Sequence, residues 1–136
     1  MGLNARLTLR LSFMTACLLA LSACVTGPRF ANLDAVIVPT EPLDLPSNAE
    51  LTVRLEDVSR GSDVIAVSTY TRLGRGPIPV MLRYDAKAID EDRPYVLRAD
   101  IRSNKTLTHR NVEEVPVLTG EAPRNDVRVP IESIDR

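Results

Sequence analysis

The 136-residue chain has few of the side chains that bind metals or carry out catalysis. It contains no tryptophan, one histidine (His109) and two cysteines, Cys17 and Cys24. A zinc site built from histidine and cysteine therefore lacks ligands, and a serine–histidine–aspartate triad would have to use His109. His109 lies in a polar alternating stretch with no nucleophile motif beside it, so we interpret it as an exposed strand residue. We expect no enzymatic activity, no metal and no soluble cofactor.

The chain also lacks an excess of basic residues and any apolar run long enough to cross a membrane. Lysine and arginine number 17 against 18 aspartates and glutamates, which gives a net charge of −1. A nucleic-acid-binding domain usually has a basic surplus, so nucleic acid is not an expected partner. The longest apolar run, Leu11–Leu21, is shorter than the stretch of about 20 residues that a transmembrane helix needs.

Residues 1–23 have the organisation of a signal peptide. Two arginines precede the apolar run and small residues follow it, the pattern of a secretory leader. The end of the run, Leu21, Ser22, Ala23 and Cys24, resembles the lipobox of bacterial lipoproteins. This resemblance implies transfer of diacylglycerol to the Cys24 sulfur, cleavage before that residue, and acylation of the new amino terminus by a fatty acid such as palmitate. The alternative is an ordinary signal peptide followed by a buried cysteine.

Lipidation at Cys24 would anchor the mature protein in a membrane. Each buried methylene contributes about 0.8 kcal/mol, and two or more acyl chains hold a protein stably. The residue after the cysteine is Val25, whereas an aspartate there resembles a signal for retention in the inner membrane. We therefore expect anchoring in the outer membrane, with the domain facing the periplasm. Because the lipid occupies the only mature cysteine, the domain folds without a disulfide.

Residues 24–44 read as a lipidated tether that includes, at Ala35–Val38, one candidate edge strand. Prolines interrupt this segment, and proline is confined to edges, turns and extended linkers. From residue 45 to residue 136, apolar and polar residues alternate with period two in short segments separated by turn residues, the pattern of half-buried strands. The sequence therefore predicts an all-β domain, an antiparallel β-sandwich of seven to eight short strands.

Within this domain we expect Tyr95, Leu97, Ala99 and Ile101 to point inward. The expected strands are 49–56, 64–72, 78–84, 95–102, 107–110, 115–118 and 127–131, with a short helical turn at 86–89. Asp57 and Ser59 suit a turn capped by side chains, because both residue types bond their own backbone two residues on. We interpret the basic residues 98, 102, 105 and 110 and the acidic residues 90–92 as solvated.

One family resemblance covers most of the expected domain, from Leu45 to about Val129. The resemblance rests on the order and spacing of six features: a Leu-Pro pair, an alternating strand, Asp-x-Ser, a proline-rich turn, Tyr-Asp and Tyr-x-Leu-x-Ala-x-Ile. In these features the domain resembles the YscW-type lipoproteins, which include type III secretion lipoprotein chaperones. The matching residues are Leu45, Pro46, Ala49, Asp57, Ser59, Pro79, Tyr84, Asp85, Tyr95, Leu97, Ala99 and Ile101.

The resemblance implies a binding module with the activity of a pilotin. Pilotins bind the C-terminal tail of an outer-membrane secretin subunit and carry it to the outer membrane on their own lipid. Such a module needs an anchor and either an exposed edge strand or an apolar groove to receive a peptide. The alternative is a housekeeping envelope lipoprotein that binds another envelope protein or an unknown ligand and has no part in secretion.

Substitution Cys24→Ala tests the lipoprotein interpretation. Without the thiol there is no thioether and no signal cleavage before residue 24, so the protein should remain an uncleaved precursor or become soluble. Fractionation of envelopes and mass spectrometry of the amino terminus measure both outcomes. A Cys24→Ala protein that still fractionates as mature outer-membrane protein would contradict the interpretation.

Overall fold

Eight strands and one turn of 3-10 helix form within residues 27–134, the part of the chain that the structure, a computed structural model, describes. The lipobox residues Leu21, Ser22, Ala23 and Cys24 lie outside the described residues. The elements are β1 (Phe30–Pro39), β2 (Glu50–Asp57), β3 (Asp63–Tyr70), β4 (Ile78–Asp85), η1 (Ala86–Ala88), β5 (Tyr95–Ser103), β6 (Thr106–Asn111), β7 (Val115–Val117) and β8 (Val127–Ser133).

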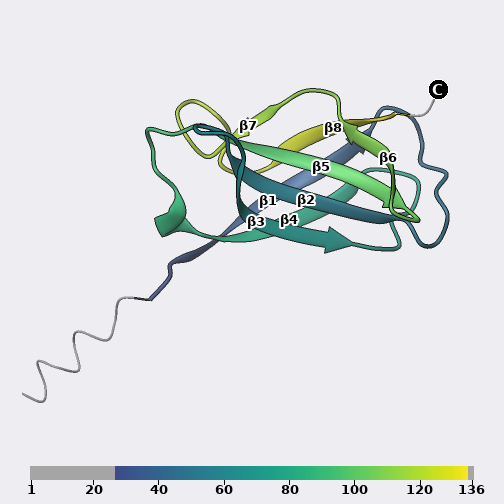
Figure 1. The fold of residues 1–136 in the computed structure, drawn as a ribbon, viewed down its shortest axis with the longest axis horizontal. Helices are drawn as coiled ribbons and strands as arrows, with labels where there is room; N and C mark the ends of the chain where they lie inside the picture. Colours follow the sequence, from purple (N-terminus) through teal and green to yellow (C-terminus); the bar gives the residue numbers. More distant parts are fainter. Residues whose placement is uncertain (1–26, 135–136) are drawn as a thin grey trace, which may run out of the picture.

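The strands form one continuous sheet that curls on itself into a nearly closed barrel (Figure 1). Its order is β3-β2-β5-β6-β8-β1-β4, with β7 paired to the first half of β5. Neighbouring strands are antiparallel, except that β1 runs parallel to β8. The prediction of an all-β fold is confirmed. The predicted antiparallel sandwich does not form, because β1 bridges β8 and β4 and so joins the strands into a single mixed sheet.

The segment expected to hold an edge strand contains an interior strand. β1 pairs with β4 from Phe30 to Ile37 and with β8 from Ala35 to Pro39, so that both its edges are hydrogen-bonded. Its alternate residues point into the barrel and are buried. The edge-strand prediction was wrong because the prolines of this region lie at the end of β1 or beyond its ends, where they remove no ladder hydrogen bond.

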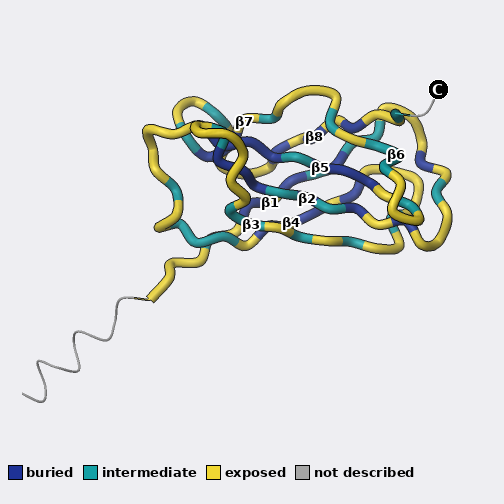
Figure 2. Tube along the Cα trace, viewed as in Figure 1, coloured by how far each residue is buried: buried dark blue, intermediate teal, exposed yellow. Residues whose placement is uncertain are grey.

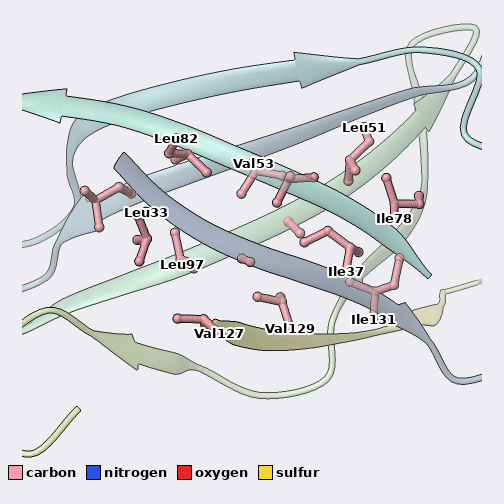
Figure 3. Packing of buried hydrophobic residues seen from close by; sticks show 14 of the residues in the cluster. Leu33, Ile37, Leu51, Val53, Ile78, Leu82, Leu97, Val127, Val129 and Ile131 are labelled. Atoms are coloured by element: carbon pink, nitrogen blue, oxygen red, sulfur yellow. The ribbon is translucent and has the colours of Figure 1, made fainter. Parts of the chain in front are cut away.

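The core is built from alternate residues of the long strands. Leu33 of β1, Leu97 of β5 and Val129 of β8 are fully buried, and Figure 3 shows such side chains converging on the barrel interior from several strands. The predicted inward face of β5 is confirmed: Tyr95, Leu97, Ala99 and Ile101 are all buried. Figure 2 shows the buried segments concentrated in the middle of the strands, with the loops exposed. Burial of this shared apolar face supplies the main free energy that holds the sheet closed.

The connection between β5 and β6 is a two-residue hairpin turn. Its central residues, Asn104 and Lys105, both have positive φ angles, 50° and 64°. Two central residues in the left-handed region define a type I′ turn, whose twist matches that of the flanking strands. Ser103 and Thr106 pair across it, so the turn sets the register in which β6 continues from β5.

Substitution Leu97→Asp tests the inside and outside assignment. Leu97 has no exposed surface, so the variant buries an unpaired carboxylate and should lose more than about 4 kcal/mol of unfolding free energy. Val112→Asp is the matched control, because 41% of Val112 is exposed. A thermal melt followed by circular dichroism should show an unfolded or strongly destabilised Leu97→Asp protein and a control close to the unmodified protein. Equal melting of the two variants would contradict the assignment.

Candidate functional site

The residues that carry the family resemblance divide into core residues and residues that fix turns. Asp57 at the end of β2 accepts hydrogen bonds from the Ser59 backbone N–H at 2.9 Å and from the Ser59 hydroxyl at 2.6 Å. Arg93 approaches the same carboxylate at 3.3 Å. These hydrogen bonds, the Ser59 hydroxyl first, hold the pKa of Asp57 below its ordinary value. The capped turn expected from the sequence is therefore present.

Two further matching residues organise the segment around η1. Asp85 caps η1: its carboxylate accepts the Lys87 N–H at 3.0 Å, and it also accepts the Arg29 N–H at 3.0 Å. Tyr95 is 1% exposed, and its hydroxyl accepts the Asp90 N–H at 2.8 Å. These contacts attach the start of the described chain and the η1 loop to the barrel. Both residues thus have structural roles.

The remaining residues that match the family lie in the core, in a loop and on β4. Ala49, Leu97, Ala99 and Ile101 are buried in the barrel, and Leu45 and Tyr84 pack partly buried against it. Pro46 lies in the loop before β2, and Pro79 is an exposed residue of β4. The sequence motif thus brings together parts of the scaffold, and a binding surface has to be sought elsewhere on the domain.

The outer face of β2 and β5 carries charges that are less solvated than we expected. Asp100 is 7% exposed and Glu56 is 5% exposed. Arg54 contacts Asp100 at 3.0 Å, and Arg98 forms an ion pair with Glu56. The basic residues Arg102, Lys105 and Arg110 are exposed as expected, but two carboxylates of this face are buried and are neutralised by arginines that lie over them, as buried charges require. Arg102 contacts Asp100 at 4.0 Å at the rim.

β3 was expected as a strand, but its exposure was not predicted from the sequence. It is rich in apolar and β-branched residues, DVIAVSTY, yet none of its residues is buried. Val64 and Val67 have relative exposures of 50% and 55%. Figure 2 shows β3 exposed or intermediate along its length. An apolar strand left open at the end of a sheet is a candidate binding surface.

β3 meets β4 at the only junction of the described barrel that is made by side chains instead of a backbone ladder. We call this junction the seam. The Tyr70 hydroxyl accepts the Met81 N–H and donates to the Met81 carbonyl, each at 2.9 Å. The Ser68 hydroxyl donates to the same carbonyl at 3.1 Å. Met81 itself is 49% exposed. The apolar composition of β3 was the sequence signal for this site. Only the sheet order shows that β3 and β4 are the two end strands of the sheet.

A pocket of about 330 Å³ adjoins the end of the seam where the loop 71–77 connects β3 to β4. Leucines from two loops line it, and Arg72 and Arg75 stand beside them. Neither arginine forms an ion pair with a described residue. Asp44 also lines the pocket, so this end of the seam combines a hollow of mixed polar and apolar character with two arginines and one aspartate.

The other groups singled out in the sequence have local roles. His109 on β6 lies 3.0 Å from the Thr108 hydroxyl through its Nδ1 atom. Glu91 pairs with Arg124 through two contacts of 3.2 and 3.1 Å, and Asp90 accepts the Asp92 N–H. Within residues 27–134 no group of three metal-binding side chains converges. The helical content of the same residues includes no segment suited to crossing a bilayer.

Comparison with known proteins identifies a family and a similar solved structure. Residues 30–129 match the family described as the type III secretion system lipoprotein chaperone (YscW). The fold is similar to the structure of an alternative pilotin from the type II secretion system of Vibrio cholerae, with 25% identity, a TM-score of 0.72, and coverage of 79% of this chain and 100% of that chain. No curated protein matches the chain. The expected family resemblance is confirmed, and it extends to include β1.

The capped turn predicts a pH dependence of stability. Because the folded-state pKa of Asp57 is lowered, its contribution is present above the unfolded pKa of about 3.9 and is lost as the pH falls through the folded pKa. Asp57→Asn should therefore lower the melting temperature most at neutral pH, and the difference from the unmodified protein should shrink below about pH 4. Thermal melts across this pH range measure the effect; a difference that stays constant with pH would show that the carboxylate charge is not involved.

Proposed function

Because this chain belongs to the YscW family of type III secretion system lipoprotein chaperones, we propose that it acts as a lipid-anchored pilotin. In this function the domain binds the C-terminal tail of a secretin subunit, and the lipid on Cys24 carries both proteins to the outer membrane. The role is one of binding and targeting, without turnover chemistry. The observation that carries the proposal is the fold: the whole length of a pilotin matches this chain at a TM-score of 0.72.

The position of the tether supports the targeting part of the proposal. The proposed lipid is attached at Cys24, six residues before β1 begins at Phe30. Six residues span at most about 20 Å even when fully extended. The Arg29 N–H and the Gly27 carbonyl are bonded to Asp85 and to the Lys87 ammonium, which attaches the start of the described chain to the η1 segment. A lipid at Cys24 would therefore hold this end of the barrel close to the membrane surface.

The distribution of exposed apolar side chains supports the binding part. Among the described residues, five large apolar side chains are exposed, and Val64, Val67 and Met81 lie on β3 and β4. Of the other two, Phe30 begins β1 and lies under the Arg83 side chain of β4, and Val112 follows β6. Exposed apolar side chains on an unpaired strand edge suit the recognition of a peptide, in which the edge gives main-chain hydrogen bonds and the side chains give selectivity.

Co-expression with the secretin of the same bacterium tests the proposal. With the intact lipoprotein, the secretin should assemble and fractionate with the outer membrane; with Cys24→Ala, it should be mislocalised or degraded, because the carrier has lost its anchor. A secretin lacking its C-terminal tail serves as the control and should be mislocalised with either form. Secretin that reaches the outer membrane equally well without the lipoprotein would contradict the proposal and favour the housekeeping alternative.

A further inference from the structure

The backbone of β4 at the seam is arranged to accept another strand. Both hydrogen-bonding groups of Met81 point toward β3, where one Tyr70 hydroxyl serves as their acceptor and donor. In an antiparallel ladder, alternate residues direct both groups to the same side. Pro79 and Arg83 therefore direct theirs to the seam as well, although Pro79 has no N–H to offer. The Tyr70 hydroxyl thus takes the place that a neighbouring strand's backbone would occupy.

The side chains along the seam match an extended apolar peptide. Val67 and Met81 point outward from the two strands and are about half exposed, 55% and 49%. Ile65, Ala66 and Tyr70 of β3 pack partly buried against the core, whereas Val64 and Val67 are exposed on the outer side. A strand that enters the seam would cover these side chains and gain their burial in addition to its main-chain hydrogen bonds.

The loop end of the seam has an excess of positive charge, two arginines against Asp44, and the opposite end has two aspartates beside Arg83. Arg72 and Arg75 lie in the loop that joins β3 to β4, are exposed, and pair with no described acidic residue. Asp63 begins β3 and Asp85 ends β4, so that both lie at the opposite end. A free C-terminal carboxylate is attracted to the arginines and repelled by the aspartates, which favours one direction for a bound peptide.

We propose that the last residues of the partner's tail enter the seam between β3 and β4 as an additional strand. The peptide runs antiparallel to β4 and parallel to β3, displaces the Tyr70 hydroxyl from Met81, and places its C-terminal carboxylate near Arg72 and Arg75. This inference rests on the proposed function for the identity of the tail. The occupant itself follows from the seam: an unpaired strand edge, apolar side chains along it, and positive charge at one end.

Tyr70→Phe gives the most specific test. The variant keeps the ring but loses the hydroxyl that competes for the Met81 N–H and carbonyl, so the peptide has only the Ser68 hydroxyl left to displace. A fluorescent synthetic peptide of the secretin's C-terminal tail should bind the Tyr70→Phe lipoprotein about two- to tenfold more tightly than the unmodified lipoprotein. Fluorescence anisotropy measures the dissociation constant. Misfolding does not tighten binding, so tighter binding supports the proposal. Unchanged or weaker binding by a Tyr70→Phe protein whose thermal melt matches that of the unmodified protein would overturn it.

Lysine substitutions supply the opposite test. Val67→Lys and Met81→Lys place charge on an edge that the peptide covers, and each should weaken binding by at least about tenfold. Val112→Lys is the matched control, because Val112 is equally apolar and 41% exposed but lies outside the seam. A tail peptide with an amidated C-terminus should bind several-fold more weakly than the free acid, and the difference should shrink in high salt.

The outcomes separate this inference from the proposed function. If the tail binds the unmodified protein and Val67→Lys, Met81→Lys and Val112→Lys bind it equally well, the seam is not the binding surface and the pilotin function stands. If the tail does not bind the unmodified full-length protein, both proposals are contradicted. Binding that is lost at the seam and retained in the control supports both.

Discussion

The pairing of β1 with β8 is the interaction on which the rest of the structure depends. It is the one parallel pairing in the described sheet, and it joins the first strand of the domain to the last. Through it the β1–β4 pair becomes continuous with the other strands, and the sheet can curl until its two ends meet. The seam between β3 and β4 is the consequence: a sheet that almost closes leaves two edges facing each other, and side-chain hydroxyls bridge them.

Local pattern was enough to predict the strands from β2 to β8 and the inward face of β5. Period-two alternation placed Leu97 and Ile101 in the core, and both are fully buried. The order of the strands in the sheet could not be predicted from the sequence. β1 pairs with β8, which lies some ninety residues further along the chain, and no local pattern specifies this partner. A single mixed sheet and a sandwich of two sheets also produce nearly the same alternation of apolar and polar residues, because each strand buries one face in either architecture.

The candidate site also has one part that could be predicted from the sequence and one part that could not. The motif that resembles the family consists of residues that hold the scaffold together, such as the Asp57–Ser59 turn and the buried Tyr95. Such residues are recognisable because a turn or a core position restricts the amino acid. The seam depends on which strands become edges, a property of the whole sheet. Pro79 in β4 is compatible with an edge, but Pro130 lies inside β8, which is paired on both sides, so proline did not identify the edge strands.

Residue-resolved amide hydrogen exchange along β4, with and without the secretin tail, tests the central claim most directly. If the tail binds at the seam, amide exchange at Met81 and Arg83, whose N–H groups face the seam, should slow strongly. Exchange at Leu82, whose N–H faces β1 in the alternating ladder, should hardly change. Tail binding that leaves Met81 and Arg83 unprotected, while amides elsewhere on the barrel become protected, would contradict the account and place the binding surface away from the seam.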